Sequence, residues 1–222
     1  MDITLNPVEA RVLGSLIEKE LTTPDYYPLT LNALTHACNQ KSNRDPVMEL
    51  DEKAVIRVLD SLRQEQLAWQ IKTAGSRAPK YEHNIKKMAE FSPREIGILC
   101  VLLLRGPQTV GELRSRTGRL YKFEDLSEVQ ETLEGLSERE DGPFVIRLPR
   151  QVGRKERRYA HLLCGEVAFD EEQRSSPSPE PARLEVLAEN ERIKTLEEKV
   201  AVLETDMEML RQEFAAFKRQ FE

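Results

Sequence analysis

A cluster of basic residues lies in a segment that the sequence predicts to be a β-hairpin. Residues 144–149 and 157–163 are typical of two short strands, and the loop between them contains Gly153. The basic residues, set against the single acid Glu156, are Arg147, Arg150, Arg154, Lys155, Arg157 and Arg158. Guanidinium and ammonium groups at this density can bind phosphate oxygens. The hairpin is therefore a candidate contact for nucleic acid.

Little in the sequence could support enzymatic chemistry. His36 and Cys38, and likewise His161 and Cys164, resemble metal-ligand pairs. Each pair alternates with apolar residues and lacks a second Cys/His pair at zinc spacing, which favours core packing. The chain has no glycine-rich phosphate loop and no nucleophile motif of the common hydrolases. We therefore predict a protein that is not an enzyme and needs no metal or other cofactor.

Composition indicates small helical cores rather than one large globule. Of the 222 residues, 39% are hydrophobic and 32% are charged. The longest apolar run, residues 96–104, is too short for a membrane helix, which needs about 20 residues. No signal peptide is visible, and Cys38, Cys100 and Cys164 lie in apolar contexts. This pattern favours reduced, buried thiols in a cytoplasmic protein that does not contact a membrane.

Charge is unevenly distributed along the chain. From Asp170 onward there are 14 acids and 8 Lys or Arg, which accounts for the whole net charge of −6. The preceding residues are balanced. Bulk charge therefore does not favour nucleic-acid binding, and only local patches could provide it.

The sequence of the first half of the chain predicts three helices followed by a hairpin. The first helix begins after Asn6, the second begins near Thr30, and the third covers residues 51–66. Two strands are predicted at residues 67–72 and 79–84.

The same order then recurs in the second half. Ser92-Pro93-x-Glu95 repeats Asn6-Pro7-x-Glu9, and Tyr159-x-His161 repeats Tyr81-x-His83. The apolar residues Val129, Leu133 and Leu136 likewise repeat Val55, Leu59 and Leu62. Matches in one order predict an internal duplication. We expect tandem winged helix-turn-helix domains at residues 1–88 and 89–169, in a fold that is mainly α with small β-hairpin wings (α+β).

The C-terminal residues predict a linker and a coiled-coil helix. Residues 170–182 contain Pro177, Pro179 and Pro181, which prevent a helix. In residues 183–222, apolar positions alternate spacings of three and four: Ile193, Leu196, Val200, Leu203, Met207, Leu210, Phe214, Phe217 and Phe221. Such heptads predict a homodimer through a C-terminal coiled coil, although the helix could instead fold back on its own chain.

Charges beside the apolar stripe favour self-association. In a parallel pair, each residue at one flanking position meets a residue of opposite charge: Arg192 with Glu197, Lys199 with Glu204, Asp206 with Arg211, and Glu213 with Lys218. An antiparallel pair also matches. Ile193 and Val200, with leucine at the alternate core positions, favour a parallel dimer.

Several long motifs resemble the YceH-like bacterial proteins. They include Pro7-x-Glu9-x-Arg11-Val12-Leu13-Gly14, Cys38-Asn39-Gln40-Lys41-Ser42-Asn43-Arg44-Asp45-Pro46 and Gly75-x-Arg77-x-x-Lys80-Tyr81-x-His83. Another is Leu113-Arg114-x-Arg116-x-x-Arg119-Leu120-x-x-Phe123, which has Leu120 where the family often has Met. The resemblance implies a bacterial protein with two winged-helix domains and brings no catalytic residues.

Basic residues outside the second hairpin could extend a nucleic-acid contact. A winged helix lays its third helix in the major groove and places its wing on the phosphates. The further candidates are Lys41, Arg44, Lys53, Arg57, Arg114, Arg116 and Arg119. Within residues 39–46, Lys41 and Arg44 have no evident local role, so a ligand contact and a structural role both stay open. Trp69 is interpreted as a core residue rather than a base-stacking platform.

An acidic helix argues against an ordinary DNA-binding mode for the second domain. Residues 124–141 contain one base, Arg139, and eight acids: Glu124, Asp125, Glu128, Glu131, Glu134, Glu138, Glu140 and Asp141. Their charges would repel phosphates. We expect a regulatory DNA-binding protein whose second domain docks through its wing. The alternative is a protein-interaction scaffold that uses the same domains and the coiled coil.

Overall fold

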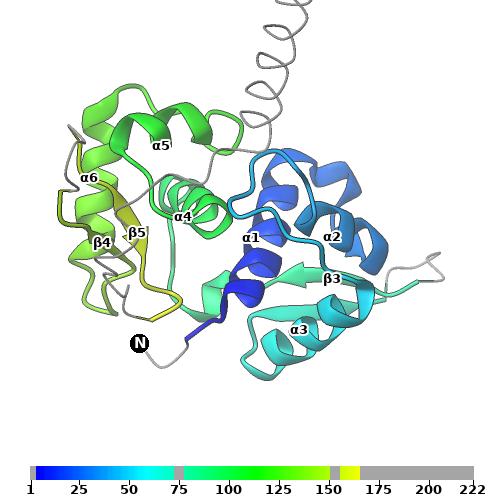
Figure 1. Ribbon diagram of the computed structural model, residues 1–222. Coiled ribbons are helices and arrows are strands. Elements are labelled where there is room, and N and C mark those ends of the chain that lie inside the picture. Colours follow the sequence, from blue (N-terminus) through cyan, green and yellow to red (C-terminus); the bar gives the residue numbers. More distant parts are fainter. Residues whose placement is uncertain (1–3, 73–77, 151–155, 166–222) are drawn as a thin grey trace, which may run out of the picture. The chain divides into compact units, whose positions relative to one another are not determined.

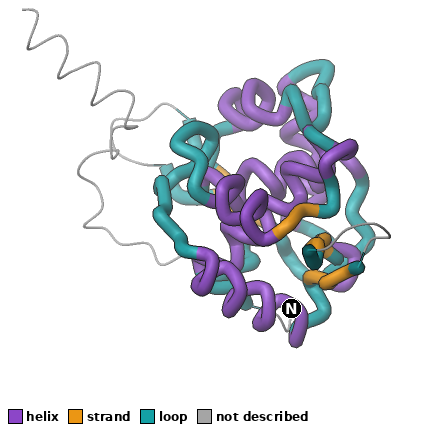
Figure 2. Tube along the Cα trace, turned by 90° about the vertical axis from the view of Figure 1, so that its right-hand side faces the viewer, coloured by secondary structure: helices purple, strands orange, loops and turns teal. Residues whose placement is uncertain are grey.

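The computed structural model describes residues 4–72, 78–150 and 156–165 (Figure 1). The predicted linker and coiled coil lie outside these ranges, as does the tip of the second hairpin with Arg154 and Lys155. Helices predominate and the strands are short and antiparallel, as the sequence predicts (Figure 2). Among the described helices, none combines the length and the hydropathy needed to cross a membrane.

Both halves contain three helices and then two paired strands. The elements of the first half are α1 (Pro7–Thr22), η1 (Pro24–Tyr26), β1 (Leu29–Thr30), α2 (Leu31–Cys38), α3 (Glu52–Gln64), β2 (Ala68–Ile71), β3 (Lys80–His83) and η2 (Ile85–Lys87). The elements of the second half are α4 (Pro93–Arg105), α5 (Val110–Thr117), α6 (Leu126–Ser137), β4 (Val145–Arg147) and β5 (Tyr159–His161). We call these halves the first and the second repeat.

Helix starts correspond between the repeats. Asn6 Oδ1 accepts a hydrogen bond from Glu9 N at 2.9 Å, and the Glu9 carboxylate accepts one from Asn6 N at 2.8 Å. Ser92 and Glu95 form the same capping box at α4. The other matched caps are Thr30 with Thr109 and Asp51 with Asp125. These caps satisfy N–H groups that a helix start leaves without partners, so each start is specified locally.

Strand pairing also corresponds. In the first repeat the strand order is β1-β3-β2, and Leu29 of β1 lies opposite Tyr81. In the second repeat β4 pairs with β5, and Gln108 forms an isolated bridge with Tyr159. Gln108 thus occupies the place that β1 has in the first repeat. Both tyrosines are buried.

The repeats meet through α1 and α4, which pack closely in one compact unit (Figure 1). Cys100 Sγ of α4 donates a hydrogen bond to Gly14 O of α1 at 3.6 Å. A Cβ atom at Gly14 would lie 3.0 Å from Leu103 Cβ. The absence of a side chain at Gly14 therefore allows the two helices to approach this closely.

Two large apolar side chains, one on β2 and one on α3, are exposed. The prediction that Trp69 is a core residue is wrong, since it is 42% exposed. It lies on β2, an edge strand, opposite Glu82. Ile56 follows the apolar spacing of α3 but is 40% exposed, because Val55 and Leu59 already form the buried face. Cys38 and Cys100 are buried as expected, whereas Cys164 is only half-buried.

Substituting Gly14 tests the packing of α1 on α4. Alanine is favoured over glycine in a helix by about 1 kcal/mol, but at Gly14 its Cβ would press on Leu103. We expect Gly14→Ala to lower the free energy of unfolding measured in denaturant. The control is Gly135→Ala in α6, where nothing that the structure describes beyond the helix itself lies within 4 Å of the added Cβ. Gly135→Ala should stabilise the protein; a stabilised Gly14→Ala variant would contradict the close contact.

Candidate nucleic-acid interface

Helix α3 presents two cations on its exposed face. Asp51 caps the helix by accepting a hydrogen bond from Ala54 N at 2.7 Å. Lys53 and Arg57 are exposed and lie one turn apart, opposite the buried Val55 and Leu59. The spacing that buries one face therefore directs both cations to solvent.

Arg63, in the last turn of α3, is a third exposed cation and is partly neutralised. Arg63 Nη1 lies 3.3 Å from Asp60 Oδ1 and 3.4 Å from Gln70 Oε1. Both members of the Arg63–Asp60 pair are well exposed, so solvent screens their attraction. Lys41, in the loop before α3, is also exposed. The first repeat thus offers dispersed cations rather than one dense patch.

The basic residues in and just after α5 differ in exposure. Arg114 and Arg119 are exposed, and Arg114 Nη2 donates to Glu124 O at 2.8 Å. Arg116 is half-buried, donates to Gln108 Oε1 and lies 3.6 Å from Glu112. Arg116 is therefore committed to the fold more than Arg114 or Arg119.

The second hairpin keeps most of its described cations at the surface. Arg147, Arg150 and Arg157 are exposed. Arg158 instead turns inward, where Nη1 donates to Pro107 O at 2.8 Å and Nη2 lies 3.3 Å from Glu112 Oε1. Three of the predicted contacts thus lie at the surface of the described hairpin, while Arg158 holds the hairpin to the loop before α5.

The exposed face of α6 is acidic, as the sequence predicts. Glu131, Glu134 and Glu138 are exposed along it. Glu128 turns back toward the start of the helix, where it accepts hydrogen bonds from Tyr121 Oη at 3.0 Å and Glu124 N at 2.9 Å. The helix itself spans Leu126–Ser137, shorter than expected because Asp125 is its extended N-cap. A surface of this charge repels DNA.

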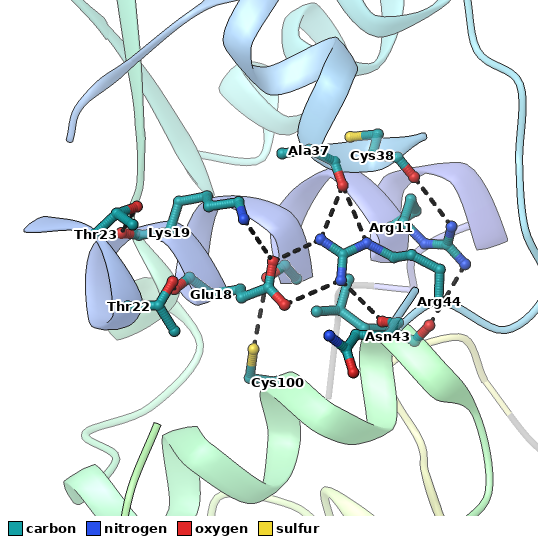
Figure 3. Close-up of polar contacts among 12 residues, drawn as sticks. Arg11, Glu18, Lys19, Thr22, Thr23, Ala37, Cys38, Asn43, Arg44 and Cys100 are labelled. Carbon is teal, nitrogen blue, oxygen red and sulfur yellow. Dashed lines mark hydrogen bonds and ion pairs between the residues drawn. The ribbon is translucent and has the colours of Figure 1, made fainter. Parts of the chain in front are cut away.

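Arg44 is buried, so it does not offer the surface contact that its position in a polar loop suggested (Figure 3). Its guanidinium lies 3.0 and 2.6 Å from the two carboxylate oxygens of Glu18. It also donates to Ala37 O, at 3.0 and 2.8 Å, and to Asn43 O at 2.8 Å. Arg44 therefore has a structural role, one that its neighbours in sequence do not reveal.

A second buried arginine lies beside it (Figure 3). Arg11 Nη1 donates to Cys38 O at 3.2 Å, while Nη2 donates to Pro46 O at 2.6 Å and to Leu104 O at 3.5 Å. Cys38 is the last residue of α2, and Leu104 lies in the last turn of α4. Burial lowers the pKa of Arg11, and the charge of Arg44 lowers it further. A guanidinium remains charged even so, and the partial negative charge of two helix ends stabilises it.

Residues 39–46 link these two arginines and both repeats. Asn39 exchanges two hydrogen bonds with the backbone of Leu50, at 2.7 and 2.8 Å. Asp45 N donates to Leu104 O at 2.9 Å, and Arg105 donates to Asn43 Oδ1. The loop thus connects the end of α2 to the end of α4. Sequence reasoning missed the roles of Arg11 and Glu18; the only signal was a charged residue within the otherwise apolar stripe of α1.

The two His/Cys pairs also differ from one another. His36 is exposed on α2, so the core-packing interpretation is wrong for it, whereas Cys38 is buried. His161 and Cys164 are half-buried at the end of β5. Within residues 4–72, 78–150 and 156–165, no three His, Cys, Asp or Glu side chains are grouped as a metal site would require.

The chain belongs to a bacterial protein family described as "Protein of unknown function, DUF480", which matches residues 5–154. Its relatives are named UPF0502 proteins. One from Geobacter sulfurreducens is 57% identical over 222 residues, the whole of both chains. One from Photobacterium profundum is 45% identical over 226 residues, covering 100% of this chain and 98% of the relative. The resemblance to the YceH-like proteins is confirmed.

Removing the charge of Glu18 tests the buried ion pair. Burial opposes ionisation of Glu18, but the hydrogen bonds and charge of Arg44 outweigh it and hold the pKa of Glu18 below its usual value. The resulting stability is complete above the ordinary glutamate pKa of about 4.3 and is lost as pH falls through the lower folded-state pKa. We expect Glu18→Gln to lower the free energy of unfolding at pH 7 by about 3–5 kcal/mol, because it leaves the Arg44 charge unpaired.

The control for this variant is Asp60→Asn, which removes an exposed partner of Arg63 and should cost about 0–1 kcal/mol. Denaturant unfolding from pH 3 to pH 8 measures both variants. Glu18→Gln should also show a weaker loss of stability in acid than the wild type. Equal stability of Glu18→Gln and wild type at pH 7 would show that the pair does not stabilise the fold.

Proposed function

We propose that the two repeats are tandem winged helices and that the protein is a regulatory DNA-binding protein whose first repeat uses α3 as its groove-reading helix. In a winged helix the third helix enters the major groove and the hairpin contacts phosphates. The order of three helices and a hairpin, together with a β1-like contact in each repeat, supports this assignment.

The contrast between α3 and α6 carries the proposal. On α3 the exposed cations Lys53, Arg57 and Arg63 outnumber two exposed acids, Glu52 and Asp60, whereas the exposed face of α6 carries glutamates and no base. Each DNA phosphate carries a full negative charge, so only α3 can approach the groove without strong repulsion. The second repeat then contributes phosphate contacts from its hairpin.

The exposed arginines of the second hairpin suit that secondary role. Arg147, Arg150 and Arg157 lie at the surface, and contacts to phosphate need no particular base sequence. We further propose that the C-terminal heptads form a homodimer. A dimer would double both contacts, and linked weak sites bind more tightly together than singly.

The acidic face of α6 favours a second candidate function, a protein-interaction scaffold. Leu126, at the start of α6, is 49% exposed beside that acidic face. An apolar residue flanked by carboxylates suits a partner with a basic, partly apolar surface. The two candidates differ in whether duplex DNA binds at all.

Fluorescence anisotropy with generic duplex DNA across a salt series tests the proposal. We expect affinity to fall steeply with salt and Lys53→Ala with Arg57→Ala to weaken binding and reduce the slope of log K against log salt by about two. The control is Lys86→Ala with Lys87→Ala, which removes the same charge from η2. If DNA does not bind at low salt, or if both double variants weaken it equally, α3 is not the DNA-reading helix.

Truncation tests the dimer. We expect the full chain to sediment as a dimer and a chain ending at Gln173 to sediment as a monomer, because the heptads of residues 183–222 are removed. Analytical ultracentrifugation of both proteins measures this, with circular dichroism as the control that the remaining fold is retained. A dimer that survives truncation would place the interface elsewhere.

A further inference from the structure

A cavity of about 280 Å³ lies where the two repeats meet. Its walls come from the start of α1, the loop before α3, the end of α4 and the end of β5. Most lining groups are apolar, among them Ala10, Met48, Leu102 and Ala160. Apolar walls with a few polar groups are typical of sites that bind small molecules.

Two residues of this lining each have a buried side-chain nitrogen that lacks a hydrogen-bond partner. Among the described residues, Arg11 Nε and His161 Nδ1 have no hydrogen-bond partner. Nη1 and Nη2 of the Arg11 guanidinium donate to backbone carbonyls, so Nε is the one nitrogen of that group without a partner. Buried polar groups are nearly always hydrogen-bonded in folded proteins, so these two atoms indicate a missing partner.

Arg11 determines what chemistry that partner has. A guanidinium N–H can only donate, so its partner must be an acceptor. Burial lowers the pKa of His161 to about 4, so its ring is neutral near pH 7 and can either donate or accept. Burial raises the pKa of the Cys164 thiol, which keeps it neutral as well. The wall therefore combines one fixed cationic donor with neutral groups, and Asp45 is the one anion among the described lining residues.

We propose that this cavity binds a small, mostly apolar molecule through a carboxylate or carboxamide oxygen that accepts a hydrogen bond from Arg11 Nε. His161 Nδ1 interacts with the second heteroatom of the same group, and the apolar body packs against Ala10, Leu102 and Ala160. This site is separate from α3 and from the exposed arginines, so it does not depend on DNA binding.

Both repeats contribute walls, so the ligand contacts both. Ala10 and Arg11 belong to the first repeat, and Leu102 and His161 to the second. A ligand that binds only the folded state stabilises it according to its concentration. Occupancy therefore strengthens the junction between the repeats.

Three probes of equal chain length test the proposal on the full chain. Hexanoate and hexanamide both carry an acceptor oxygen, whereas the ammonium group of hexylammonium has no acceptor for Arg11 Nε. We expect saturable binding of hexanoate, hexanamide or both in protein-observed NMR, with shifts concentrated at the cavity, and a higher thermal midpoint. Comparison of the two separates a carboxylate from a neutral carbonyl ligand.

Two variants and one control locate the binding. His161→Phe removes the ring nitrogen and should weaken binding about two- to tenfold, the effect of one hydrogen bond. Ala10→Leu fills the cavity from α1 and should abolish saturation. His36→Phe changes an exposed histidine outside the cavity and should leave binding unchanged. The thermal midpoint of each ligand-free variant reports whether it is folded.

The outcomes separate clearly. Acceptor-dependent binding that Ala10→Leu abolishes and His36→Phe retains supports the proposal. Absence of saturable binding to the wild type means that only water occupies the cavity, which overturns it. Equal binding of hexylammonium, or binding that neither His161→Phe nor Ala10→Leu changes, also overturns it.

Discussion

The arrangement of the two repeats depends on the buried guanidinium of Arg11. Removing such a charge from water is costly, and only well-placed polar partners offset the cost. Here the partners are backbone carbonyls of Cys38, Pro46 and Leu104, from the end of α2, the following loop and the end of α4. These three segments must meet at one point for the charge to be tolerated. A side chain of the first helix thereby couples the second helix to the helix that opens the other repeat.

The Glu18–Arg44 pair reinforces the same junction. It ties α1 to the loop of residues 39–46, and the loop in turn donates from Asp45 N to Leu104 O. This junction is built from buried contacts and does not involve the solvent faces of the third helices. The different charges of α3 and α6, which are equivalent in order and capping, therefore do not affect it.

Local features of this fold were predictable from sequence, and long-range ones were not. The capping box of Asn6 and Glu9 spans four residues, so its sequence pattern is sufficient to locate the helix start. Lys41 and Arg44 look alike in the same polar loop, yet one is exposed and the other is buried. The difference depends on Glu18, which is distant in sequence. The position of Trp69 on an edge strand and the cavity likewise depend on how separate segments meet, which periodicity does not reveal.

The close approach of α1 and α4 at Gly14 has a consequence for dissecting the molecule. A cut near residue 90 would divide the chain at a natural point in the sequence repeat. It would, however, separate Gly14 of α1 from α4, and it would remove Leu104 O, the third carbonyl partner of Arg11. The two halves have the same order of elements but share a buried contact, so binding experiments on an isolated half would measure a protein that lacks part of its core.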